Sequence, residues 1–138
     1  MAVKVSAKAE YACLAVIALA SRYLLDKPVP IREIAESHGI PETFLTQILI
    51  RLKGAGLVTS TRGSSGGYRL ARDPGEISLG DVLRVIDGGD HSARAPRRAS
   101  AVVLSQLWEQ IQASQVHILN HTSIAQLAEQ SKTPDWTI

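Results

Sequence analysis

The chain has 138 residues and a formal net charge of +2, and 45% of its residues are hydrophobic but only 4% are aromatic. This length suits one domain with an aliphatic core plus one appended element. No apolar run is long enough to span a membrane, and the run that ends at Ala20 lacks the cleavage site of a signal peptide. A single cysteine excludes an intrachain disulfide and suits a reducing compartment. We therefore expect a cytoplasmic protein that does not bind a membrane.

The charges are distributed unevenly along the chain. Residues 1–72 hold ten Lys and Arg against five Asp and Glu, whereas residues 73–138 hold five against eight. An excess of positive charge in one part of a chain is what a phosphate-binding surface needs. A split of this size also arises by chance in small domains, so the charge alone does not assign a function.

The first third of the chain predicts two helices separated by a break. Ser6 is placed to cap a helix that runs to about Leu24. Apolar residues recur in it at helical spacing: Ala12, Ala15, Val16, Leu19 and Tyr23. Two prolines then interrupt the helical pattern. A second helix is predicted over residues 31–37, with Ile34 and Ala35 facing the core.

A tight turn leads into a third predicted helix. Gly39 can take the positive φ that a sharp turn between two helices requires. Pro41 suits the first turn of a helix that runs to about Ala55, and Gly56 is placed to end it with a left-handed cap. Its expected buried stripe is Phe44, Leu45, Ile48, Leu49 and Leu52.

A hairpin follows the third helix. Residues 57–61 and 67–70 are predicted strands, and between them lies a tip of Gly and Ser residues beside Arg62. Small residues and one positive charge suit a loop laid against a phosphate backbone or a minor groove. Helix, turn, helix and hairpin in this order predict a mainly α fold, in which residues 1–88 form a winged helix-turn-helix domain with a two-stranded β wing.

The third helix carries polar residues outside its buried stripe. They are Glu42, Thr43, Thr46 and Gln47 in its first half, which usually meets base edges, and Arg51 and Lys53 in its second half, beside the apolar Ile50. Gln47 can form two hydrogen bonds with adenine, and the methyl group of Thr46 can pack on thymine. The carboxylate of Glu42 either accepts a hydrogen bond from the amino group of cytosine or only stabilises the N-terminus of the helix through the helix dipole. Arg51 suits a phosphate contact, and for Lys53 a solvated position is the alternative.

The second half of the chain begins with a well-marked short helix. Ser78 is placed as its cap, Asp81 as the capping-box partner, and Ile77 with Val82 as a hydrophobic staple. Gly88 follows the expected end of this helix at about Asp87. Residues 89–101 are polar and aperiodic, and we expect a mobile loop there.

Residues 102–138 are expected to form a dimerisation helix, which runs to about His121, and a C-terminal tail. A heptad-like seam recurs along the helix at alternating spacings of three and four: Leu104, Leu107, Ile111, Ser114, Ile118 and His121. Trp108 and Leu119 widen this seam. A helix of this length has little to pack on within a small domain. We therefore expect a homodimer, with packing inside the chain as the alternative.

Short motifs spread over most of the chain add a family resemblance. They are residues 6–8 with 11–12, 31–35, 39–41, 52–58, 62–63, 66–71 and 77–82. In this order they resemble the Rrf2 family of bacterial winged-helix regulators, which includes iron–sulfur, nitric-oxide and cysteine-metabolism sensors. The likeness extends to about Leu127. It implies a dimeric transcription factor, usually a repressor, whose long C-terminal helix crosses to the partner subunit.

The resemblance also implies which residues lie near DNA. These are Lys8, Thr46, Gln47, Arg51, Arg62, Ser64, Ser65 and Tyr68. The pattern of the third helix adds Thr43 to this set.

One departure from the family concerns its cofactor. Many members hold an iron–sulfur cluster on three cysteines in the loop before the long helix, but here that loop has none, and Cys13 is the only thiol. We therefore expect no cofactor. Cys13 is interpreted as a core residue, with a redox-sensitive thiol as the alternative. His117 and His121 have a spacing that can bind a metal, but two such residues are usually surface decoration, and we expect no metal.

These observations predict a regulator rather than an enzyme, because no arrangement of catalytic residues stands out. We expect a sequence-specific, DNA-binding transcriptional repressor that acts as a homodimer on double-stranded DNA. The alternative is a winged-helix module that binds a partner protein and has weak or no specific affinity for DNA. An effector, if one acts, would be a protein or a small molecule.

Overall fold

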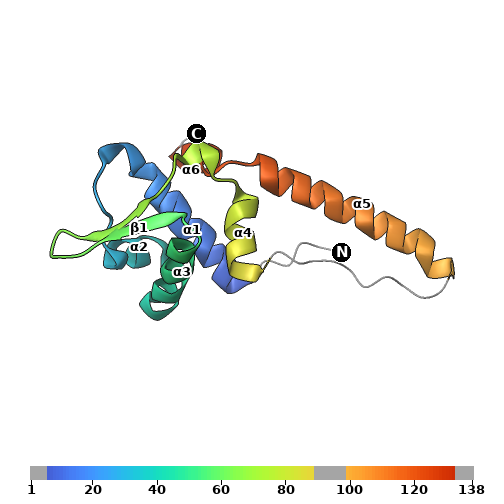
Figure 1. Ribbon diagram of the computed structural model, residues 1–138, viewed down its shortest axis with the longest axis horizontal. Coiled ribbons are helices and arrows are strands. Elements are labelled where there is room, and N and C mark those ends of the chain that lie inside the picture. Colours follow the sequence, from blue (N-terminus) through green and yellow to red (C-terminus); the bar gives the residue numbers. More distant parts are fainter. Residues whose placement is uncertain (1–5, 89–98, 133–138) are drawn as a thin grey trace, which may run out of the picture.

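The computed structural model describes residues 6–88 and 99–132. It has the expected mainly helical fold, in which a compact body carries a small hairpin on one side and a long projecting helix on the other (Figure 1). Its elements in chain order are α1 (Ala7–Ser21), η1 (Tyr23–Leu25), α2 (Ile31–His38), α3 (Glu42–Gly54), β1 (Val58–Thr61), β2 (Gly67–Leu70), η2 (Pro74–Glu76), α4 (Leu79–Asp87), α5 (Ala99–His121) and α6 (Ile124–Lys132). Residues 89–98 of the predicted loop lie outside the described residues, and residues 99–101 are helical, so the prediction that the long helix starts at residue 102 is wrong.

Helix α1 begins where the sequence predicts and ends earlier. The hydroxyl oxygen of Ser6 accepts a hydrogen bond of 3.0 Å from the backbone N–H of Ala9, which caps the helix. The prediction that the helix continues to Leu24 is wrong, because the chain tightens into the 3-10 turn η1 after Ser21. Leu24 is 93% exposed, so its side chain gives no core contact that would support a further α-helical turn.

The helix-turn-helix is built from the predicted caps. Gly39 has a φ of 63° and ends α2, and α3 begins directly after Pro41. At the other end of α3, the N–H of Leu57 donates to the carbonyl of Leu52 at 2.9 Å. The N–H of Gly56 donates to the carbonyl of Lys53 at 3.0 Å, which completes a Schellman motif. The C-terminal end of α3 is therefore set by local hydrogen bonds, whereas no side-chain hydrogen bond caps its start at Pro41.

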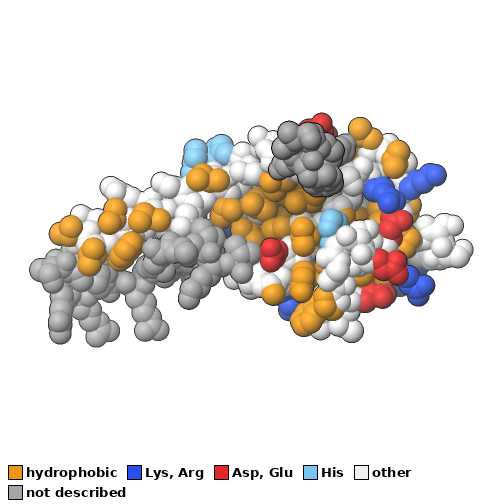
Figure 2. Space-filling model, turned by 180° about the vertical axis from the view of Figure 1, so that it is seen from behind, with side chains coloured by type: hydrophobic (Ala, Val, Ile, Leu, Met, Phe, Trp, Pro, Cys, Tyr) orange, Lys and Arg blue, Asp and Glu red, His pale blue; other side chains and the backbone are white. Residues whose placement is uncertain are grey.

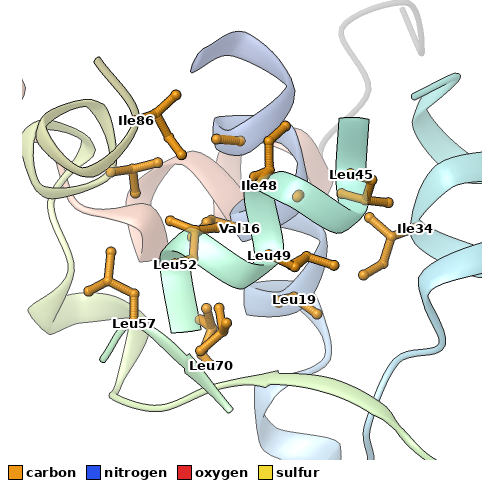
Figure 3. Packing of buried hydrophobic residues seen from close by; sticks show 14 of the residues in the cluster. Val16, Leu19, Ile34, Leu45, Ile48, Leu49, Leu52, Leu57, Leu70 and Ile86 are labelled. Carbon is orange, nitrogen blue, oxygen red and sulfur yellow. The ribbon is translucent and has the colours of Figure 1, made fainter. Parts of the chain in front are cut away.

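The inner face of α3 forms the centre of the core. Leu45, Ile48, Leu49 and Leu52 are fully buried. Figure 3 shows them packed against side chains of α1, α2, α4 and the hairpin: Val16, Leu19, Ile34, Leu57, Leu70 and Ile86. This arrangement confirms four of the five residues that the helical pattern predicts as buried.

Phe44 is the exception in the predicted stripe, because its side chain is 47% exposed. At 3.6 residues per turn it lies roughly a quarter of a turn away from the centre of the buried stripe. Its ring contacts that of Tyr11 on α1, with the centroids 6.4 Å apart. Phe44 therefore lies at the edge of the α1–α3 contact, and the prediction that it is buried is wrong.

The wing is an antiparallel hairpin that is tied to the body. Val58 pairs with Leu70 and Thr61 pairs with Gly67 in its register. The backbone of Tyr68 also exchanges two hydrogen bonds of 2.9 Å with Val29, which lies in the link between α1 and α2. The link is therefore joined to β2 by an isolated antiparallel β-bridge.

Two glycines of the wing are needed for internal packing. A Cβ atom at Gly66 would lie 2.1 Å from the carbonyl oxygen of Thr61, and one at Gly67 would lie 2.4 Å from that of Val29. From the sequence pattern, the glycines of the tip are interpreted as residues that let the wing backbone come close to DNA. The structure shows that these two let segments of the protein backbone approach each other.

The predicted capping box of α4 is confirmed. The N–H of Asp81 donates to the hydroxyl of Ser78 at 3.0 Å, and the N–H of Ser78 donates to the carboxylate of Asp81 at 2.9 Å. Ile77 and Val82 are fully buried, and Gly88 ends the helix with a φ of 86°. Each of these features was readable from residues that are close together in the sequence.

Helix α5 projects from the body, and the chain returns to the body at its C-terminal end (Figure 1). Arg84 of α4 donates to the side-chain carbonyl of Asn120 at 2.7 Å, and Leu79 donates its N–H to the carbonyl of Thr122 at 2.8 Å. Helix α6 then packs on α1 and buries Ile124 and Ala128. The sequence pattern predicts only a tail beyond His121, so helix α6 is a feature that the structure adds. Among the described residues, no helix is both long and apolar enough to cross a membrane.

The close approach at Gly66 predicts a stability effect. We expect Gly66→Ala to lower the free energy of unfolding by about 1–3 kcal/mol, because the new methyl group overlaps the carbonyl of Thr61. Gly54→Ala is the matched control, since a Cβ there meets nothing within 4 Å. It should leave stability unchanged or raise it by up to about 1 kcal/mol. Urea unfolding followed by circular dichroism measures both, and equal midpoints for the two variants would contradict this account.

Candidate nucleic-acid interface

The outer face of α3 is a continuous exposed surface. Thr43, Gln47 and Ile50 lie near its centre, and Thr46 and Arg51 lie on its two flanks. All five side chains are exposed, whereas the opposite face of the helix forms the core. Helix α3 protrudes from the lower side of the body in Figure 1, so this face is accessible to a large partner.

Internal hydrogen bonds restrict what some of these side chains offer. The hydroxyl of Thr46 donates to the carbonyl of Glu42 at 2.9 Å, so its donor is used within the helix. The ammonium group of Lys53 donates to the hydroxyl of Ser60 at 2.6 Å and holds α3 against β1. The sequence left Lys53 open between a phosphate contact and solvation, and this hydrogen bond shows a structural use. Within the described chain, no side-chain hydrogen bond is recorded for Gln47.

The wing places its predicted residues at two different depths. Arg62, Ser64 and Ser65 are exposed at the tip, which is the part of the hairpin farthest from the body. Tyr68 is half-buried at the base and packs against the core, while its backbone pairs with Val29. Only the tip is therefore free to follow the outline of a partner.

Lys8 lies on α1, the helix that contacts the start of α3 through Tyr11 and Phe44. It is half-buried in the first turn of α1, three residues before Tyr11, whose ring contacts Phe44 near the start of α3. Residues three apart on a helix share a face, so Lys8 lies toward the start of α3. The predicted residues of α1 and α3 thus come together, and those of the wing tip form a second, separate group.

Ion pairs distinguish the arginines of this region from one another. Arg22 pairs with Glu33 and Arg69 pairs with Asp26, each with an N–O distance of 2.7 Å. Arg51 and Arg62 have no such carboxylate partner among the described residues. Figure 2 shows Lys, Arg, Asp and Glu side chains gathered at the end of the body that lies away from the projecting helix α5, the arm of the molecule. The positive charges that remain available for phosphate groups include Arg51 on a flank of α3 and Arg62 on the wing.

The only thiol lies in a protected place. Cys13 is half-buried on α1 and packs against the core. Burial raises the pKa of its thiol to about 11, and the negative charges of Asp87 and Glu10 contribute to the shift. At neutral pH the group is therefore a thiol, which is a weak nucleophile and a weak metal ligand. This environment favours the core interpretation over the redox-sensitive one.

The two histidines of α5 are stacked. The ring centroids of His117 and His121 are 4.0 Å apart with 26° between the planes. Nδ1 of His121 lies 2.8 Å from the carbonyl oxygen of His117, so that nitrogen is engaged with the backbone. Across the residues that the structure describes, no three His, Cys, Asp or Glu side chains are arranged to hold a metal ion.

A second exposed surface runs along α5. Leu104, Leu107, Trp108 and Ile118 are exposed, whereas Ile111 and Leu119 are half-buried. Figure 2 shows hydrophobic side chains recurring along this arm. An apolar stripe of this length on an isolated helix is typical of a surface that another helix covers.

Comparison with known sequences identifies a family. A sequence model of the Rrf2 family, described as an iron-dependent transcriptional regulator, matches residues 5–130. A helix-turn-helix transcriptional regulator of Mycobacterium tuberculosis is 40% identical over 131 residues, which cover 91% of this chain and 81% of the relative. The regulator IscR of Photobacterium profundum is 31% identical over 129 residues, which cover 90% of this chain and 74% of IscR.

Solved structures show the same fold. CymR, described as the global cysteine regulator of Bacillus subtilis, superposes with a TM-score of 0.84 and 32% identity over 96% of this chain and 100% of CymR. IscR of T. potens superposes with a TM-score of 0.79 and 34% identity over 95% of this chain and 90% of IscR. The similarity therefore covers the winged helix and the projecting helix together.

Proposed function

The chain belongs to the Rrf2 family and is a DNA-binding transcriptional regulator, and we propose that it is a sequence-specific repressor that acts as a homodimer without an iron–sulfur cluster. The observation that carries this proposal is the outer face of α3. Thr43 and Gln47 are exposed there beside Arg51, and Arg62 is exposed on the wing. A protruding helix with base-reading residues next to a basic wing suits the major groove of double-stranded DNA.

Each predicted DNA-binding residue has a proposed role. Thr43, Thr46 and Gln47 contact base edges, and Arg51 and Lys8 contact phosphate groups on either side of α3. Arg62, Ser64 and Ser65 contact the backbone or the adjacent minor groove from the wing tip. Tyr68 offers only its phenol from the base of the wing, because its backbone is paired with Val29. Repression follows if the bound dimer excludes other proteins from the site. The proposed location is the cytoplasm, because the chromosome lies there.

The proposed dimer is formed by α5. This helix has 23 residues, so it is about 34 Å long, and among the described residues its hydrogen bonds to α4 lie at its C-terminal end. Its apolar stripe needs a cover, and a second copy of the same stripe provides one in a two-fold arrangement. Two α3 helices would then address two half-sites about one helical turn apart.

A second function is favoured by one specific observation. Phe44 and Ile50 are 47% and 59% exposed, so the outer face of α3 is more apolar than the sequence predicts. An apolar outer face suits a winged-helix module that binds a partner protein instead of specific DNA. The same partner, or a small molecule, could act as the effector of a DNA-binding form.

The family description as iron-dependent does not fit the residues of this chain. Cluster iron is held mainly by cysteine thiolates, and each chain has one cysteine. That cysteine is half-buried, and the pKa of its thiol is about 11. We propose that control of this protein does not pass through a cluster.

The dimer is tested by variants of α5. We expect Leu107→Glu to convert the dimer to a monomer, because it places a charge in the apolar stripe. Gln106→Glu is the matched control, since it adds the same charge next to the stripe and should leave the dimer intact. Light scattering at micromolar concentration gives the mass, and circular dichroism reports whether the fold is kept. A monomeric parent protein would contradict the proposal.

DNA recognition is tested by two variants with different signatures. We expect Arg62→Ala to weaken binding to all sequences and to lower the salt slope by about 1, because it removes one phosphate contact. Gln47→Ala should relax the preference at one base pair by about 1–3 kcal/mol. The control is Arg72→Ala, an equal loss of charge in a hollow beside Val85 of α4. Binding curves that match the parent for both Arg62→Ala and Gln47→Ala would contradict the assignment.

The absence of a cluster is tested by chemical analysis. We expect protein that is prepared without oxygen, with iron and sulfide supplied, to contain neither in stoichiometric amount. The reason is that a dimer offers two thiols from separate α1 helices, too few for the usual ligand set. Stoichiometric iron and sulfide that accompany the dimer through gel filtration would overturn this part of the proposal.

A further inference from the structure

Three residues of α3 form an inclined row across its outer face. Phe44, Gln47 and Ile50 are spaced by three, which places them along one ridge of the helix with Gln47 in the middle. All three are exposed, and the two outer ones are large and apolar. An amide flanked by two hydrocarbon groups is therefore the central feature of the surface that faces the proposed DNA.

Neither apolar side chain is needed for the core. Leu45, Ile48, Leu49 and Leu52 already bury the inner face of α3 completely. Phe44 lies outside the buried cluster, where its ring contacts the tilted ring of Tyr11 and stays 47% exposed. Ile50 lies near the centre of the outer face and is 59% exposed. Exposed side chains of this size at the centre of a binding surface indicate an apolar feature on the partner.

Nearby polar groups are fewer than the sequence suggests. The donor of Thr46 is used by the carbonyl of Glu42, which leaves its methyl group and its oxygen lone pairs. Lys53 is held by Ser60 of β1. On this face, Gln47 and Thr43 are therefore the side chains that keep both a hydrogen-bond donor and an acceptor for base edges. Phe44 and Ile50 add hydrocarbon surface beside them.

The major groove of DNA has one apolar feature, the C5-methyl group of thymine, and an amide side chain pairs best with adenine. We propose that Phe44 and Ile50 contact the methyl groups of two thymines, one on either side of an adenine that Gln47 contacts. This inference rests on the proposed function. Arg51 and Arg62 supply the positive charge that this surface needs next to phosphate groups. The half-site is then rich in A·T pairs, and the protein recognises it chiefly by methyl groups.

The spacing of the row sets the spacing of the methyl groups. Phe44 and Ile50 are six residues apart, which is about 9 Å along the helix axis at 1.5 Å per residue. Base pairs rise 3.4 Å each along a strand, so the two methyl groups lie roughly two to three base pairs apart. Gln47 lies between them, and its adenine is therefore expected between the two thymines.

Replacement of thymine by uracil tests the proposal, because it removes the methyl group and keeps the base pairing. A duplex enriched by the parent protein from random sequence is made with uracil at one thymine at a time. We expect two positions in each half-site at which uracil weakens binding about fourfold, the value for one buried carbon group. The Phe44→Ala variant should bind the thymine duplex and the duplex with uracil at one of these positions with equal affinity. The Ile50→Ala variant should show the same loss of discrimination at the other position.

Leu25→Ala is the matched control, since Leu25 is 62% exposed on η1, away from α3, and its loss should leave both uracil effects intact. The result that overturns this inference alone is selective binding of the enriched duplex with no uracil effect at any position. Uracil effects that persist unchanged in both Phe44→Ala and Ile50→Ala also overturn it. A parent protein that enriches no sequence overturns the proposed function as well, and a partner protein would then be the occupant of this face.

Discussion

Burial of the inner face of α3 is the constraint on which the arrangement of this protein depends. Leu45, Ile48, Leu49 and Leu52 have no exposed surface, and they are packed among α1, α2, α4 and the wing (Figure 3). Each contributes about 1.5–3 kcal/mol by leaving water. Because the same helix carries the proposed reading face on its other side, the core fixes the direction of that face. The body therefore presents α3 as a rigid element.

The joint between α4 and α5 extends this rigidity to the arm. A Cβ at Gly80 would lie 2.2 Å from the side-chain oxygen of Asn120, so a larger residue there would displace the Asn120 side chain from its place between α4 and α5. Arg84 then binds that oxygen at 2.7 Å, and α6 returns to pack on α1. In the proposed dimer, these contacts would set the separation of the two α3 helices and hence the spacing of the half-sites.

Features that depend on neighbouring residues could be predicted from the sequence. The cap at Ser6, the turn at Gly39 and the capping box of Ser78 and Asp81 each have their signal within a few residues. Features that depend on distant contacts could not: Phe44 is exposed because the aliphatic stripe fills the core without it. Likewise, the ion pairs that occupy Arg22 and Arg69 join separate elements, so the sequence does not tell them from Arg51 and Arg62.

The central claim is that two copies of α3 enter the major groove in successive turns of one duplex. Hydroxyl-radical footprinting of the dimer on an enriched duplex tests this most directly, because it maps the protected sugars on both strands. Two protected regions are expected on one face of the DNA, with centres about 10 base pairs apart. A single protected region, or protection that is unchanged when the sequence is scrambled, would contradict it.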